Sequence, residues 1–176
     1  MKPIGPLMKE HRLIERMVAL CHKEATAMKK GKPADGTFIA LVVDFFRTYA
    51  DKTHHGKEED ILFRDLATKE IGKELHNIME ELILDHRKAR NVVSSLDKAS
   101  RAYVKGNAEQ RSGVIDSLEM IVAIYPPHIE KEDKQFFYPI LGHLTAIEQS
   151  TMLTEFQAFD SKMIHQHYSD IIDAIV

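Results

Sequence analysis

Apolar residues recur at alternating steps of three and four along four segments of the chain, and this spacing constrains the fold more than any other feature. Residues so spaced lie on one face of an α-helix, whereas a half-buried strand alternates every second residue. Each of the four stripes also carries a histidine. The stripes are Leu7, His11, Ile14, Val18, Cys21, Ala25 and Met28; His55, Glu59, Leu62 and Leu66; Ile71, Leu75, Ile78, Leu82, His86, Ala89, Val93 and Leu96; and Val114, Leu118, Ile121, Tyr125, His128, Glu132 and Phe136. The sequence therefore predicts an all-α fold with histidines on the buried faces.

Short breaks separate these segments and set the expected domain organisation. They fall at residues 31–36, 64–68, 105–107, 125–127 and 139–145. We expect a single domain over residues 1–176, with an antiparallel up-and-down four-helix bundle at about 5–140 and a helical extension at about 144–176. The extension should hold two helices, roughly Thr145–Phe159 and Lys162–Ile175. Pro126 and Pro127 are expected to kink or interrupt the fourth helix just before His128.

Composition excludes several classes of function. The chain has 176 residues, 44% of them hydrophobic and 29% charged, with a formal net charge of −3. This balance gives no basic footprint for nucleic acid, and no run approaches the ~18 apolar residues of a membrane span. The single cysteine, Cys21, can form neither an internal disulfide nor a cysteine metal site. We expect a cytoplasmic protein that binds neither nucleic acid nor membrane.

Four histidines on facing stripes favour a metal site, although one alone would usually be an ordinary core residue. Two of them are followed four residues later by a carboxylate, in the pairs His55/Glu59 and His128/Glu132. Positions i and i+4 share a helix face, and unpaired buried carboxylates are costly. Four imidazoles and two carboxylates in a bundle interior suit a pair of iron or manganese ions, and zinc less specifically.

An overlapping pair, His54/Glu58, offers the alternative register. It is rotated by about 100° from the first pair on a regular helix, and its forward extension reaches Asp65 instead of an apolar residue. We therefore prefer His55 and Glu59 as the inward pair.

Other residues near the expected site are less decisive. Glu15 follows the first stripe histidine by four residues and is either an acceptor for an imidazole N–H or a surface acid. Asp133 lies five residues after a stripe histidine and is expected to point away. His165 and His167, in the extension, offer imidazoles that could reach the metal pocket.

Four motifs in order give the sequence a family resemblance: KEHRLIE, HHGKEEDILF, LILDHRKAR and PPHIEKEDKQFF. Together they cover about residues 7–140, and the chain resembles the hemerythrin family, specifically its HHE cation-binding branch. The resemblance implies an antiparallel four-helix bundle with a non-heme diiron centre. Carried over by position, it implies His11 and His55 on one iron, His86 and His128 on the other, and Glu59 and Glu132 as bridges.

The sequence departs from the oxygen carriers of that family at Leu82, where they have a second histidine one turn before the ligand on the third helix. The remaining set resembles HHE relatives linked to oxygen or nitric oxide sensing, peroxide handling and iron chemistry. It predicts an open position for oxygen, nitric oxide or peroxide. A sensor and an enzyme remain as alternatives, as does a reversible oxygen carrier or an iron-storage protein without turnover. A ferritin-like oxidase would need Glu-x-x-His pairs, and none occurs.

Overall fold

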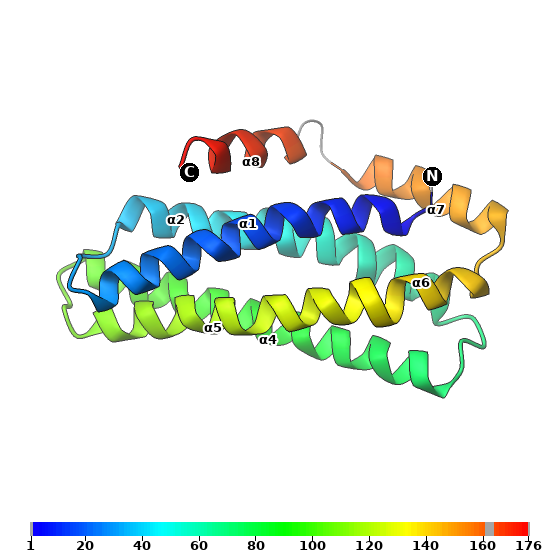
Figure 1. Cartoon of the computed structure of the whole chain (residues 1–176), viewed down its shortest axis with the longest axis horizontal. Coiled ribbons are helices and arrows are strands. Elements are labelled where there is room, and N and C mark those ends of the chain that lie inside the picture. Colours follow the sequence, from blue (N-terminus) through cyan, green and yellow to red (C-terminus); the bar gives the residue numbers. More distant parts are fainter. Residues whose placement is uncertain (1, 161–163, 176) are drawn as a thin grey trace.

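The computed structural model describes residues 2–160 and 164–175, which are mostly helical and include no strand. Four long rods form the bundle (Figure 1). The first is α1 (Ile4–Lys29) and the third is α4 (Lys73–Val104). The second comprises α2 (Gly36–Phe45), η1 (Phe46–His55), η2 (Glu58–Phe63) and α3 (Arg64–Leu66). The fourth comprises α5 (Gln110–Lys131), η3 (Glu132–Phe136) and α6 (Phe137–Ile140), followed by the short η4 (Leu141–His143). The predicted all-α class is confirmed.

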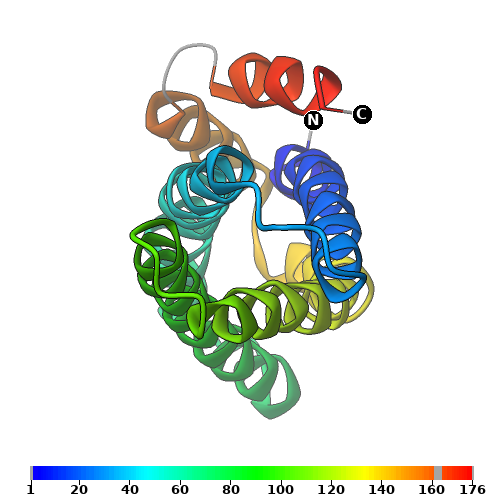
Figure 2. The same ribbon diagram turned by 90° about the vertical axis from the view of Figure 1, so that its left-hand side faces the viewer.

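The four rods surround a common interior in the end-on view of Figure 2. Beyond them, α7 (Ala146–Phe159) and α8 (Ile164–Asp173) lie on the outside of the bundle, and α8 contacts both α1 and η1. A capping box formed by Thr145 and Glu148 starts α7. Two helices of the extension thus follow the expectation, although the expected start of the second, Lys162, lies outside the described residues. No helix in the described ranges combines the length and apolarity needed to cross a bilayer.

A polar layer divides the apolar core into two clusters. On α1 the layer contains Glu10 and His11, with Leu7 in one cluster and Ile14 in the other. On α4 it contains His86, which lies between the two clusters in the same way. The second and fourth rods cross the layer at residues 53–58 and 128–132. All four rods therefore place buried polar side chains at one level of the bundle.

The second and fourth rods change from α-helical to π-helical hydrogen bonding at this level, over Phe46–His55, Glu58–Phe63 and Glu132–Phe136. A turn closed by i→i+5 bonds holds more residues than an α-helical turn, and such stretches occur frequently at functional sites. They shift the register of the side chains that follow. Prediction of the inward face from a regular helical period is therefore least secure where the polar layer lies.

The expected interruption at Pro126 and Pro127 is wrong, because α5 continues through both residues to Lys131. Proline removes a backbone donor and costs helix stability. Here the neighbouring Tyr125 and His128 are both buried. Their packing in the interior offsets the local cost and keeps His128 on a continuous helix.

Candidate metal centre

Seven buried side chains converge in the polar layer as two groups. One group contains His11, His54, Glu58 and Glu132, whose candidate ligand atoms lie within 4.8 Å of one another. The other contains His55, His86 and His128 at the same spacing. All seven side chains are fully or almost fully buried. Each group has the size and chemistry of a single-ion site.

The two carboxylates extend between the groups. Glu58 Oε1 lies 3.5 Å from His54 Nε2, and Glu58 Oε2 lies 3.5 Å from His86 Nε2. Glu132 Oε2 lies 3.0 Å from His11 Nε2, while its Oε1 lies 3.3 Å from His128 Nε2 and 3.7 Å from His86 Nε2. Each carboxylate therefore presents one oxygen to each group of imidazoles.

Nine buried polar atoms of these side chains lack a hydrogen-bond partner. They are Nε2 of His11, His54 and His86, both ring nitrogens of His128, and both oxygens of Glu58 and Glu132. Buried polar atoms are ordinarily satisfied, and an unsatisfied one costs about 1–3 kcal/mol. Eight of these nine atoms, all but Nδ1 of His128, face the space between the two groups and fit cations as their missing partners.

The outward-facing Nδ1 atoms of the imidazoles each lie near a carboxylate. The pairs are His11 with Asp133 at 2.8 Å, His54 with Glu10 at 2.8 Å, His55 with Asp51 at 3.4 Å, His86 with Glu59 at 2.7 Å, and His128 with Asp85 at 3.8 Å. A carboxylate on the far nitrogen fixes the tautomer and ring orientation of a metal-binding histidine. This arrangement aims the Nε2 atoms inward.

The two buried carboxylates, Glu58 and Glu132, differ in their electrostatic surroundings. Burial, together with the charge of Glu132, raises the pKa of Glu58 well above its ordinary value. Burial also disfavours the charged form of Glu132, but His128, His11 and His86 outweigh it and hold the pKa of Glu132 well below its ordinary value. Without a cation, the proton is therefore held by Glu58 in preference to Glu132. Metal binding must displace that proton.

The structure brings together five of the six side chains predicted as ligands: His11, His55, His86, His128 and Glu132. It places the sixth, Glu59, outside both groups, where Glu59 Oε1 accepts hydrogen bonds from His86 Nδ1 and from Arg90 Nη2, each at 2.7 Å. His54 and Glu58, the alternative register, face inward instead. A regular period extrapolated from Leu62 and Leu66 selects Glu59, whereas the π-helical turns at Glu58–Phe63 bring Glu58 inward.

The structure also places the four other residues that the sequence suggested near the site. Asp133, expected to point away from the site, bonds His11 from outside the two groups. Glu15 is half-buried and pairs with Arg12. His165 belongs to neither group and His167 is exposed.

Unlike the oxygen carriers that it resembles, the chain has no histidine at position 82, and the structure places a third imidazole, that of His55, beside His86 and His128. Leu82 itself is fully buried in the apolar cluster that includes Phe136. We predict that Leu82→His leaves the metal content unchanged and lowers stability by about 2–4 kcal/mol, because an imidazole there replaces apolar packing. Metal analysis and urea unfolding of the metal-free variant check this. Tighter metal retention by the variant would show that the centre lacks an imidazole.

A four-helix bundle with histidines and carboxylates facing inward defines a metal-binding protein, and the family comparison agrees. The model of the hemerythrin HHE cation-binding domain matches residues 2–141. The chain belongs to this family. No match was found among curated proteins or among solved structures.

Proposed function

We propose that this chain is a non-heme diiron protein that binds or reacts with oxygen, nitric oxide or peroxide. In this proposal His11 and His54 hold one ion, and His55, His86 and His128 hold the other. Glu58 and Glu132 bridge the two ions. Relative to the set predicted from sequence, His54 is added and Glu58 takes the place of Glu59.

The observation that carries the proposal is the placement of one oxygen of each buried carboxylate toward each imidazole group. A single-ion site would not require two carboxylates to extend between two sets of nitrogens. The mixed N/O donor set suits iron or manganese, and zinc less specifically. Among these ions, iron supplies the redox chemistry that oxygen, nitric oxide and peroxide require.

The protein contributes orientation and exclusion of water. Four of the five outer carboxylates, all but Asp85, accept hydrogen bonds from the imidazoles and fix those rings. The apolar clusters on either side of the polar layer keep bulk solvent away. A partly open cavity of about 240 Å³, lined by Asp51, His55, Arg90 and Tyr125 among others, borders the centre. Its lining includes His55, of the group with His86 and His128, but neither His11 nor His54.

The two ions would have unequal numbers of protein ligands. With both carboxylates shared, the ion at His11 and His54 has two imidazoles and the other ion has three. We place the open coordination position at the former, in contrast to the sequence argument that derived it from the absence of a histidine at Leu82. The third imidazole, from His55, also keeps a reversible oxygen carrier as a second candidate.

Reaction of the reduced, iron-loaded chain with each small molecule tests the proposal. We expect a rapid change of the optical spectrum with oxygen, nitric oxide or hydrogen peroxide. Steady consumption of peroxide or nitric oxide would identify an enzyme, whereas an adduct that is reversed by removing the gas would identify a sensor or carrier. An unchanged spectrum with all three would contradict the proposal.

A further inference from the structure

A lysine side chain is buried beside the metal centre. Lys57 is 0% exposed, and its Nζ donates to Glu10 and to Asp160, the latter at 2.5 Å. A buried ammonium is costly unless it is paired. Lys57 therefore links α1, the second rod and the residue that follows α7.

Glu10 connects this ion cluster to a residue of the metal centre. Its second oxygen, Oε2, accepts from His54 Nδ1 at 2.8 Å, on the far side of the ring from the inward Nε2. The contacts thus run in series from Asp160 through Lys57 and Glu10 to His54. None of the intermediate side chains belongs to either group of candidate ligands.

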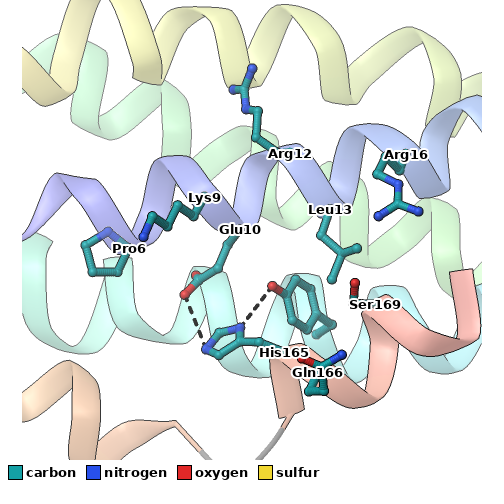
Figure 3. A pocket seen from close by; sticks show the side chains of 10 residues that line it. Pro6, Lys9, Glu10, Arg12, Leu13, Arg16, His165, Gln166 and Ser169 are labelled. Carbon is teal, nitrogen blue, oxygen red and sulfur yellow. Dashed lines mark hydrogen bonds and ion pairs between the residues drawn. The ribbon is translucent and has the colours of Figure 1, made fainter. Parts of the chain in front are cut away.

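Asp160, at the outer end of this series of contacts, is itself contacted by a residue of the C-terminal extension. Asp160 Oδ2 lies 3.0 Å from His165 Nε2, and Tyr49 OH lies 3.0 Å from the other ring nitrogen of His165. Figure 3 shows His165 of α8 facing Glu10 of α1, and both residues line a surface pocket. Asp160 and His165 both lie beyond residues 2–141, the part of the chain that the family domain covers.

Glu10, Asp160 and His165 come close enough to form a cation site themselves. The ammonium of Lys57 already pairs with both of these carboxylates. The charges of these carboxylates are therefore paired without a metal ion. The consequence of the cluster lies in its contact with His54.

We propose that the C-terminal extension acts as an outer clamp on one of the two metal positions, the one at His11 and His54, with Lys57 and Asp160 as positioning residues. This inference rests on the proposed function. The carboxylate of Glu10 orients His54 and strengthens it as a ligand. Asp160 takes part of the pairing with the ammonium of Lys57, so that Glu10 does not pair with it alone and its Oε2 stays on His54 Nδ1.

Asp160→Asn tests the clamp because it removes one charge with little change in shape. The ammonium of Lys57 would then pair with Glu10 alone and weaken the hold of Glu10 on His54. Outer-shell substitutions typically cost 10–100-fold in metal affinity. We expect about tenfold weaker binding at one of two equivalents in an anaerobic Fe²⁺ titration, with the other equivalent unchanged.

Three further variants make the test specific. Asp173→Asn breaks the exposed ion pair between α8 and Arg16 and should bind both equivalents as the wild type does. Asp160→Glu, which keeps the charge, should restore much of the affinity. His165→Ala, at a half-exposed position, should weaken the same equivalent to a smaller extent and covers the case in which Asp160→Asn does not fold.

The outcomes separate the clamp from the diiron proposal. The clamp alone would be overturned if the wild type binds two equivalents of Fe²⁺ and both Asp160→Asn and His165→Ala bind them with the same affinity as the wild type. An equal loss in Asp173→Asn would also overturn it, because docking of α8 in general would then explain the effect. A wild-type chain that binds fewer than two equivalents would overturn the proposed diiron centre itself.

Discussion

Glu58→Gln should weaken metal binding by more than about 100-fold while leaving the metal-free fold intact, a larger loss than the 10–100-fold of outer-shell changes. Glutamine has the shape of glutamate but cannot bridge two cations with two anionic oxygens. In the metal-free protein burial and the charge of Glu132 raise the pKa of Glu58 and favour its protonated form. The amide therefore resembles the side chain that it replaces, and only the metal-bound state loses an interaction.

Glu59→Gln is the matched control, because Glu59 is the neighbouring acid on the same turn. It bonds the outer nitrogen of His86 rather than facing the interior. We expect a loss of roughly tenfold, typical of an outer-shell partner. Metal titrations of both variants, with unfolding curves of the metal-free forms, make the comparison. A greater loss in Glu59→Gln than in Glu58→Gln would restore the register preferred from the sequence.

Removal of metal should lower the melting temperature by about 10–20 °C. A ligand that binds only the folded state stabilises it by about 2.7 kcal/mol at one hundred times its dissociation constant, and two ions give about twice that value. For a chain of this size about 1 kcal/mol corresponds to about 2–4 °C. The nine unpartnered polar atoms of the metal-free centre are the structural source of the difference.

Calorimetric scans of the iron-loaded protein before and after chelation measure this effect. Glu58→Gln serves as the control, because its scans should coincide with and without iron. Coincident scans for the wild type at saturating iron would show that the polar layer does not bind metal strongly.

Regular helices made much of the site predictable from the sequence. His11, His86 and His128 lie on α-helical stretches, so an apolar stripe with the ordinary helical period indicates the direction of each side chain correctly. Glu132 follows His128 by four residues and faces the same interior. The four-rod architecture depends on the same periodicity, and it was predicted for the same reason.

The second rod limits what periodicity can predict. Its π-helical stretches turn both His54 and His55 into the interior, each toward a different group, and they turn Glu58 inward in place of Glu59. The adjacent histidines in the sequence were the available signal, since both could serve if the two ions lie side by side. The buried Lys57 had no sequence signal, because its partners Glu10 and Asp160 are brought together only by the tertiary fold.

The central claim is that two ions occupy the polar layer, and the most direct measurement is the iron content of the reconstituted chain. The chain is loaded with Fe²⁺ without oxygen, freed of unbound metal, and analysed for iron per chain with optical spectra before and after exposure to air. The account predicts two irons per chain and a new absorption band after oxidation. One iron per chain, or none, would contradict it.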